Sequence, residues 1–552
     1  MKKDLTKQDD LTDDFHPNLW IDGDFLMISD VQTGEIKKLA RRVEIIQRLR
    51  NVDDKSIQLK LRYLDSDGSD NIILLNREDV FTKRGAAKLQ AVGVDCPDYL
   101  FNIIMRFLRD SESSAETINI HTTLGWNTEN EKIVYRHNES LGGNSTYGGD
   151  FRLEPIGSLK GQLEWIDAHV IGFGPMELAV AIGLAAPVLG LLQQSMPLES
   201  MPIHIFNDSS KGKTTALRCM LSLGGSPDAV NDGITRKEGL LKTLHATDNA
   251  ILSSLRGNHG LLAGFDETGS LSVNDLTPLI YRISEGKEKG RLNRNSDIRR
   301  VETWGTVVVT TGEFPISSRL SHAIGARIRL LEIGEVQWTK SPEHADDIRA
   351  AIMQHNGHII PAFAEYLLSV PESEIVERWQ NWREWCVDQM EFDPFASRLA
   401  DRYAVILLAG QLAHMVLNQP LDTEGLIWPL LLNANNATAE QRDLAKSALE
   451  CLKEAVARNS HKFPTEGPIA YAREIWGRIN SNSNGTKSLF IYPNDFRRIL
   501  REAMFEDSET VLAVWRTKGW LEHEKGKYTR KKTMVSGQNG INVIVIKNWE
   551  AI

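Results

Sequence analysis

Cysteine is scarce in this sequence. The 552 residues contain four cysteines, none of them at C-x-x-C spacing: Cys96, Cys219, Cys386 and Cys451. Structural zinc sites use closely spaced cysteine pairs, and disulfide-stapled domains are small and cysteine-rich. The scarcity therefore excludes a zinc module or a disulfide framework as the basis of the fold, and it fits a protein of the reducing cytoplasm.

The sequence also lacks an apolar run long enough to span a bilayer. The longest is "ELAVAIGLAAPVLGLL", residues 177–192, which contains Gly183 and Pro187. A membrane-spanning helix needs about 20 mostly apolar residues. We therefore expect a buried helix at 177–192 and no membrane partner. The N-terminal stretch "MKKDLTKQDDLTDDFHP" is polar and has no apolar signal core.

Positive charge is not in excess, because the formal net charge is −10. This argues against nucleic-acid binding over the whole surface but leaves room for a local basic channel. Hydrophobic residues make up 41% and charged residues 25%, which is ordinary for a globular protein. The length predicts two to four domains, since one hydrophobic core rarely organises so many residues.

Changes in the pattern of apolar and polar residues along the chain predict a multidomain α/β protein. Short alternating runs such as "SIQLKLRYLD" indicate a β-rich module, and buried strands alternating with helices further on indicate a parallel sheet covered on both faces. The tail reads as two helices and a basic hairpin, the order of a winged helix. The expected segments are a disordered lead at 1–16, a β-rich N-terminal domain at 17–150, a parallel-sheet core at 151–342, a helical segment at 343–482 and a winged-helix domain at 483–552.

The stretch "IHIFNDSSKGKTTALRCML", residues 203–221, predicts a phosphate-binding loop between a strand and a helix. Such a loop needs inward-facing backbone N–H groups, a lysine for the β- and γ-phosphates and a hydroxyl for Mg²⁺. In the pattern G-x-x-x-x-G-K-[ST], Asn207 replaces the first glycine. Asparagine tolerates positive φ better than other non-glycine residues, so we expect that conformation there. The predicted nucleotide-binding residues are Asn207, Ser210, Lys211, Gly212, Lys213, Thr214 and Thr215.

A second element supports this prediction over a coincidental Gly-Lys-Thr at a helix start. The apolar strand "LLAGF" ends in Asp266 and Glu267, 53 residues after Lys213. Asp266 would hold Mg²⁺ together with Thr214, and Glu267 would polarise the attacking water. ATP and Mg²⁺ are therefore the expected ligands, while an exposed acidic turn after a buried strand is the alternative.

Several longer stretches carry a family resemblance. They are "GSLKGQLEWIDAHVIGFGPMELAVAIGLAAPVLGLL", "SSKGKTTAL", "YRISEGKEKGRLNRNSDIRRVETWGTVVVTTGE", "GARIRLLEI" and "RLADRYAVILLAGQLA". Together they resemble the AAA+ ATPases, and more closely the helicase-like domain family of phages, plasmids and cassette elements, whose members are similar to minichromosome-maintenance helicases. The resemblance covers residues 126–415, and departs from the family at Asn207 and at Gln411, where the family has a glutamate.

The resemblance implies an AAA+ core at 151–342 with a helical lid at 343–482, forming a ring, most often a hexamer. It also implies a first sensor at the end of the strand "TVVVTT", where we choose Thr311 over Thr310. An arginine finger that reaches the neighbouring subunit's nucleotide is expected at Arg327, with Arg329 as the alternative. For each of these residues an ordinary surface or loop-capping role is the competing interpretation.

Two basic segments suggest DNA as a partner. The first precedes the sensor strand, where the resemblance implies a hairpin that projects into the ring channel; its basic residues are Lys287, Lys289, Arg291, Arg294, Arg299 and Arg300. The second is the tail stretch "KGKYTRKK", in which Arg530, Lys531 and Lys532 would lie on a wing. A solvated charged hairpin and a protein-binding wing are the alternatives.

Arg402 lies on a helix of the lid segment. It is a possible second sensor that touches nucleotide, although a structural ion pair is the commoner role for such an arginine.

The leading hypothesis is an ATP-dependent DNA helicase that replicates a mobile element or phage, acting on a fork and cooperating with other replication proteins. A second hypothesis keeps the fold without the motor, as a nucleotide-gated DNA-binding scaffold, initiator or defence-system subunit. A metabolic kinase is a weaker third, because the basic hairpin would have no role in it.

Overall fold

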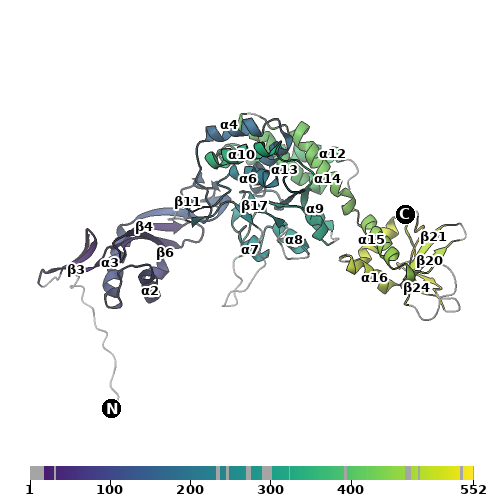
Figure 1. Cartoon of the computed structure of the whole chain (residues 1–552), viewed down its shortest axis with the longest axis horizontal. Coiled ribbons are helices and arrows are strands. Elements are labelled where there is room, and N and C mark those ends of the chain that lie inside the picture. Colours follow the sequence, from purple (N-terminus) through teal and green to yellow (C-terminus); the bar gives the residue numbers. More distant parts are fainter. Residues whose placement is uncertain are drawn as a thin grey trace, which may run out of the picture. The chain divides into compact units, whose positions relative to one another are not determined.

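The structure is a computed structural model that describes residues 18–29, 33–231, 236–243, 248–268, 275–288, 301–321, 324–390, 395–418, 420–465, 474–482, 485–505, 507–534 and 539–550. The predicted disordered lead at 1–16 lies outside these residues. The chain divides into two compact units (Figure 1). One comprises Met1–Thr123 and Arg136–Gly149, and the other comprises Leu124–Tyr135 and Asp150–Ile552.

The smaller unit is built on a five-stranded sheet with the order β11-β7-β4-β5-β6, beside a three-stranded antiparallel sheet β1-β2-β3. Helix α3 packs on β4, and its apolar face buries Ile104 and Leu108. The strands are β1 (Asn18–Asp22), β2 (Phe25–Ser29), β3 (Ile36–Arg41), β4 (Val43–Asn51), β5 (Ile57–Leu64), β6 (Asp70–Asn76), β7 (Glu116–His121), β10 (Ser140–Leu141) and β11 (Thr146–Tyr147). The helices are α1 (Arg77–Val80), α2 (Lys83–Ala91) and α3 (Phe101–Ser114).

The predicted boundary at residue 150 needs a correction. Strands β8 (Leu124–Glu129) and β9 (Lys132–Arg136) fall within the predicted N-terminal domain, yet residues 124–135 belong to the larger unit. Trp126 explains why, because its indole Nε1 donates to the carbonyl of Pro187 at 2.7 Å. β8 also pairs in parallel with β16 (Asn258–His259). These contacts join residues over 60 positions apart, which local sequence patterns cannot reveal.

The centre of the larger unit is a five-stranded sheet with the order β15-β17-β18-β12-β19, in which every recorded pairing is parallel. The first strand in sequence therefore lies between the last two, and all carboxyl ends meet at one edge. The strands are β12 (Met201–Phe206), β15 (Leu241–Thr243), β17 (Ala263–Asp266), β18 (Val307–Gly312) and β19 (Leu331–Ile333); two short strands, β13 (Val230–Asn231) and β14 (Arg236–Lys237), pair apart from it.

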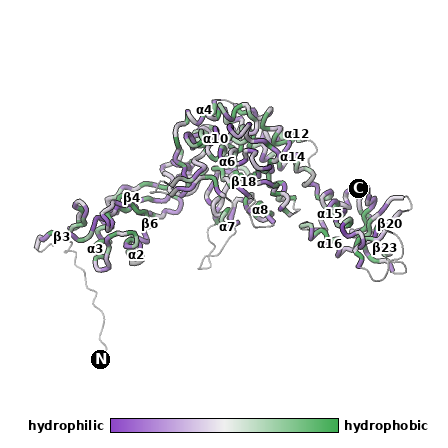
Figure 2. The backbone as a smooth tube through the Cα atoms, viewed as in Figure 1, coloured by the Kyte–Doolittle hydropathy of each residue, from purple (hydrophilic) through white to green (hydrophobic). Residues whose placement is uncertain are grey.

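Helices cover both faces of this sheet, as its continuously apolar strands require. On one face α5 (Gly174–Leu192) and α6 (Lys213–Ser222) contact β18, and on the other α7 (Asp248–Ser253) and α8 (Thr277–Glu285) share a core with Phe265 and Val308. Helix α5 has 19 residues and extends beyond the apolar run at 177–192, so by length and composition it could cross a membrane, contrary to the expectation from the sequence. However, 94% of its 18-residue apolar window is buried inside the protein. Figure 2 lets the reader follow these apolar segments along the chain.

Further helices complete the larger unit. Helix α10 begins at Ser341-Pro342, where the serine hydroxyl caps the backbone N–H of His344 and proline supplies the preferred first residue. The longest helix, α13, packs between α5 and α12. The bounds are α4 (Leu159–His169), α9 (Ile324–Arg329), α10 (Pro342–Gln354), α11 (Ile359–Ser369), α12 (Glu372–Gln389), α13 (Ala396–Leu417) and α14 (Trp428–Arg442).

The C-terminal part begins earlier than the predicted boundary at 483. Helix α15 (Leu444–Arg458) shares a core with α16 (Pro493–Glu502) and α17 (Ser508–Thr517), because its buried Leu449 and Leu452 lie in one cluster with Phe496 and Trp515. The sheet has the order β20-β21-β24-β22, with β23 also paired to β24; its strands are β20 (Gly477–Ser481), β21 (Lys487–Ile491), β22 (Leu521–Glu522), β23 (Arg530–Lys532) and β24 (Ile541–Ile546).

Gly183 sets the close approach of α5 and α6. A Cβ at this position would lie 2.6 Å from Leu223 Cδ1 and 3.1 Å from the carbonyl of Met220. We expect Gly183→Ala to be tolerated, because the end of a leucine side chain can move, and Gly183→Leu to destabilise the larger unit by about 2–3 kcal/mol through overpacking. Denaturant unfolding of both variants measures this, and equal stability of the two would contradict it.

A buried histidine joins the two central strands. His204 of β12 is fully buried, its Nε2 lies 3.0 Å from the carbonyl of Phe314, and its Nδ1 lies 2.8 Å from Thr310 Oγ1. A carbonyl only accepts, so Nε2 carries the proton and Nδ1 accepts from the threonine hydroxyl. Burial lowers the pKa of His204 to about 4.

This histidine predicts a loss of stability in acid. Because its folded pKa lies below its unfolded value of about 6.5, the unfolded chain binds more protons between these limits, and stability falls as the pH drops from 6.5 to 4, by roughly 3 kcal/mol from this residue. His204→Gln keeps one donor and one acceptor but does not titrate. Its thermal midpoint should therefore fall less over this pH range than that of the wild type, and parallel curves would refute the assignment.

Candidate functional site

The predicted phosphate loop joins β12 to α6 at the carboxyl edge of the parallel sheet. Gly212 caps α6 with φ 81°, and a Cβ on it would lie 2.7 Å from Thr339 Oγ1. This position therefore needs glycine both for its conformation and for the space. Ser210 also has positive φ, at 65°. The loop turns through two left-handed residues before the helix, which leaves the helix N-terminus facing a cavity.

Asn207 departs from the expectation. It is not among the residues with positive φ, so its side chain and not its backbone conformation explains its presence. The side-chain Nδ2 donates to the carbonyl of Val336 at 3.1 Å, and Oδ1 accepts from the backbone N–H of Asp208 at 2.8 Å. The asparagine thus fastens the start of the loop to the segment after β19, which a glycine could not do.

The side chain of Lys213 turns back over the loop. Its Nζ donates to the carbonyls of Asn207 and Asp208, each at 2.7 Å. Burial lowers the pKa of Lys213, and the nearby carboxylates of Glu313, Asp266 and Asp208 oppose this shift. The ammonium group is thus surrounded by oxygen atoms of the kind that phosphate oxygens would replace.

Three strand ends bring the predicted metal and sensor residues together. Thr214 Oγ1 lies 3.1 Å from Asp266 Oδ2, and Thr311 Oγ1 hydrogen-bonds to Asp266 Oδ1. The backbone N–H of Glu267 donates to the same threonine hydroxyl at 3.3 Å, and Glu267 has φ 61°. A left-handed non-glycine residue at a strand end is a strained arrangement of the kind that clusters at functional sites.

The two candidate sensor threonines have different surroundings. Thr310 donates its hydroxyl proton to His204 Nδ1 between the strands. Thr311 faces Asp266. The alternation of side chains along β18 places only the second of these hydroxyls at the site, as the choice of Thr311 requires.

A cavity of about 530 Å³ opens beside the loop. Ser210, Lys211, Gly212, Lys213, Thr214 and Thr215 line one side of it. The other side comes from Arg218 of α6 and from the start of α10, including Ser341, Pro342, Asp346 and Arg349. No local sequence pattern predicts the α10 residues, because they lie more than 120 residues downstream of the loop.

The run "RIRLLEI", residues 327–333, has the composition of a strand but is a strand only in its second half. Residues 324–329 form the helix α9, and the strand starts only at Leu331. Arg327 turns into the interior of the larger unit, where Nη2 donates to the carbonyl of Ser317 at 3.3 Å and burial lowers the pKa of the guanidinium. The buried carboxylate of Glu332 lies on the same side and attracts it. Arg329 instead pairs with Glu199 at 2.7 Å.

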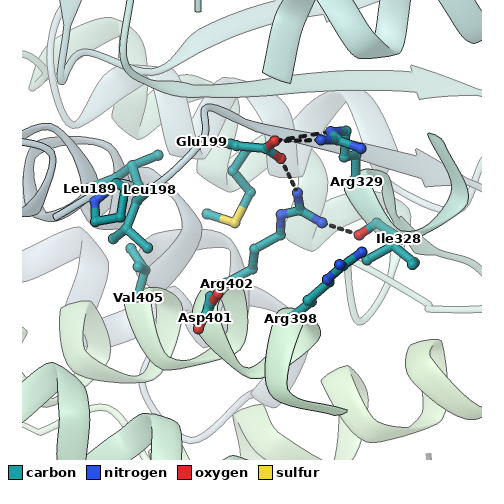
Figure 3. Close-up of a pocket in the computed structure, with 11 residues that line it drawn as sticks. Leu189, Leu198, Glu199, Ile328, Arg329, Arg398, Asp401, Arg402 and Val405 are labelled. Carbon is teal, nitrogen blue, oxygen red and sulfur yellow. Dashed lines mark hydrogen bonds and ion pairs between the residues drawn. The ribbon is translucent and has the colours of Figure 1, made fainter. Parts of the chain in front are cut away.

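Arg402 lies in the pocket drawn in Figure 3, where Glu199 bridges two arginines. Its Nη2 lies 3.2 Å from Glu199 Oε2, and its Nη1 donates to the carbonyl of Ile328. Burial lowers the pKa of Arg402 to about 10. Arg329 and Arg398 complete the basic lining of this cavity of about 250 Å³.

This pocket lies at the opposite edge of the sheet from the phosphate loop. Glu199 and Met201 line it at the start of β12, whereas the phosphate loop follows the end of the same strand. A six-residue strand spans roughly 20 Å. Arg402 is therefore too far from the phosphate loop of this chain to contact a nucleotide there. It forms a structural ion pair with Glu199, which was the alternative interpretation.

Most of the predicted channel hairpin, including Lys289, Arg291, Arg294, Arg299 and Arg300, lies outside the described residues. Its two ends are described and run antiparallel. Lys287 forms a bridge with Thr303, and the N–H of Glu288 donates to the carbonyl of Glu302 at 3.0 Å.

The predicted wing is less basic than its sequence suggests. β23 and β24 form an antiparallel pair, but Glu522 takes ion pairs from both Arg530 and Lys532, each at 3.0 Å. Lys531 between them is exposed. Such surface ion pairs contribute little free energy, so a phosphate could replace the carboxylate without a large penalty.

Gln411, a departure from the family pattern, has a local explanation. Its Oε1 accepts from the indole Nε1 of Trp382 at 3.1 Å, linking α13 to α12. A glutamate could accept the same hydrogen bond, so the exchange alters little.

Comparison with solved structures places the fold. The chain matches a structure described as "SCCmec type IV Cch - active helicase", with a TM-score of 0.75, 22% identity, and 97% of this chain and 98% of that chain covered. A second match, "The A form apo structure of NrS-1 C terminal region", has 11% identity, covers 90% of this chain and 95% of that chain, and has a TM-score of only 0.27, too low to support an argument. No curated protein matches the chain.

Two family models match. Residues 443–550 match the Cch helix turn helix domain, a range that agrees with the early start of the C-terminal core at α15. The chain is thus a mixed α/β multidomain protein with a parallel sheet and a C-terminal helix-turn-helix domain. Residues 27–303, half of the chain, match the domain of unknown function DUF927, and the protein belongs to this family.

Proposed function

We propose that the protein is an ATP-dependent DNA helicase of a mobile genetic element or phage, with an AAA+ core that works in a hexameric ring. The proposal rests on one observation: Thr214 and Thr311 both contact Asp266 at one edge of a parallel sheet, beside a cavity lined by Lys213. The fold shared with a protein described as an active helicase supports it.

The site residues divide the work of phosphoryl transfer. Lys213 pairs with the β- and γ-phosphates, and the backbone N–H groups from Ser210 to Thr215 cradle them. The Thr214 hydroxyl and the Asp266 carboxylate are oxygen donors of the kind Mg²⁺ prefers, and they are close enough to share an ion through its waters. An ion held by these two residues would neutralise charge that develops on the phosphates. Glu267 orients and polarises the attacking water, and Thr311 senses the γ-phosphate.

The arginine finger is best assigned to Arg329, the alternative of the sequence analysis. Arg327 is turned inward to Ser317 and Glu332. Arg329 pairs with Glu199, and it lines a pocket at the edge of the sheet away from its own phosphate loop. A guanidinium in this position can serve only a neighbour's nucleotide, which requires an oligomer. Arg398 and Arg402 add positive charge to the same pocket.

DNA is the polymer that hydrolysis would move. The antiparallel arms at Lys287 and Thr303 support the channel hairpin expected from the sequence, whose five further basic residues lie outside the described residues. The helix-turn-helix domain supplies a second contact with DNA. Lys531 would contact phosphates directly, and Arg530 and Lys532 would exchange the carboxylate of Glu522 for phosphates. Other replication proteins would load the ring at a fork.

Lys213→Ala tests the motor. We expect it to lower DNA-stimulated ATP hydrolysis about 100-fold or more and to abolish displacement of a labelled strand from forked DNA, because the transferred phosphoryl group loses its cation. Lys160→Ala, on the exposed surface of α4, is the matched control. Unchanged ATPase in Lys213→Ala would contradict the proposal. DNA binding and ATPase without unwinding in the wild type would favour the nucleotide-gated scaffold.

Mixing two inactive variants tests whether Arg329 acts between subunits. Arg329→Ala should lower ATPase by about 10³-fold, as for other arginine fingers. In an equal mixture with Lys213→Ala, half of the subunits keep Lys213, and half of these face a neighbour that keeps Arg329. The rate per subunit should therefore recover to about one quarter of wild type. An exposed-arginine variant, Arg458→Ala, is the control. No recovery would show that Arg329 acts within its own subunit.

A further inference from the structure

A third acidic side chain reaches the phosphate loop. Glu313 directly follows β18, and its Oε1 accepts a hydrogen bond from the hydroxyl of Ser209 at 2.6 Å. Both side chains are exposed. The roles proposed for Lys213, Asp266 and Glu267 leave this contact unexplained.

Glu313 also acts on the lysine of the site. Among the carboxylates that favour the charged form of Lys213, Glu313 has the largest effect, ahead of Asp266 and Asp208. The same carboxylate therefore accepts a hydrogen bond from the loop and attracts its ammonium group. These are the two interactions that the terminal phosphate of a triphosphate makes in such a loop.

The backbone that carries Glu313 is fixed. His204 donates to the carbonyl of the next residue, Phe314, and is itself buried between strands. The preceding residue, Gly312, has no space for a side chain, because a Cβ there would lie 2.3 Å from Thr268 Oγ1. Only the exposed side chain of Glu313 is therefore free to change its partner when a ligand enters.

We propose that Glu313 is a placeholder for the γ-phosphate: its carboxylate accepts the hydrogen bond of Ser209 and attracts Lys213 in the nucleotide-free protein, and a triphosphate must displace it. This inference rests on the proposed function, because it takes the ligand to be a nucleoside triphosphate. A diphosphate ends before this position and meets less of the negative charge. The placeholder thus lowers affinity for triphosphate more than for diphosphate, and it keeps the loop in its binding conformation between turnovers.

Calorimetric titration of the full-length protein tests the placeholder. With a non-hydrolysable ATP analogue and Mg²⁺, Glu313→Gln should bind about tenfold more tightly than wild type, since one like charge is removed. ADP affinity should change by less than about twofold. Ser209→Ala should shift the triphosphate affinity in the same direction, and the double variant should gain less than the sum of the two. Glu365→Gln, on the exposed face of α11, should change nothing.

The possible results distinguish a failure of the placeholder role from a failure of the proposed nucleotide-binding function. If wild type binds the analogue and Glu313→Gln binds it equally or more weakly, the placeholder is wrong and the proposed function stands. A fall in hydrolysis rate with unchanged affinity makes Glu313 a catalytic group and also overturns the placeholder. If neither protein binds either nucleotide, both proposals fail. Thermal unfolding of each variant identifies any loss of fold.

Discussion

The register of three parallel strands is the constraint on which the site depends. In the sheet, Ile205 of β12 lies beside Thr311, and Phe265 of β17 lies beside Thr310, so the loop after β12, Asp266 and the end of β18 arrive at the same level. A slip of one residue would turn Thr311 into the layer now occupied by His204 and move the hydroxyl away from Asp266. The buried His204–Thr310 hydrogen bond makes such a slip costly, because it would leave polar groups unpaired in the core.

The local parts of the site could be predicted from the sequence, because they depend on neighbouring residues. A strand, a turn with Gly212, a lysine and a helix follow one another within 20 residues, and each has its own signature. The acidic end of β17 likewise follows a short apolar run. The expectation for Asn207 was wrong for a related reason. It assumed that Asn207 is needed for a positive φ, whereas its side chain donates to the carbonyl of Val336, 129 residues away in the sequence.

Other features depend on contacts that no local pattern encodes. The run from Arg327 has strand-like composition, yet packing of Ala326 and Leu330 into the core under α8 favours one helical turn before β19. The boundary at 483 follows a polar stretch, but the core of the C-terminal domain extends back to α15 through buried leucines. The sequence predicts a strongly basic wing because it does not show that Glu522 of β22 forms ion pairs with Arg530 and Lys532.

The insertion of β8 and β9 has a consequence for anyone who wishes to cut this protein into pieces. The chain passes between the two units three times, after residues 123, 135 and 149. A fragment that starts at residue 151 would therefore lack the indole of Trp126 and the phenol of Tyr135, and would leave the carbonyls of Pro187 and Gly260 without their donors. A usable expression boundary for the larger unit falls ahead of Leu124, and the smaller unit is best obtained by grafting a short bridge between residues 123 and 136.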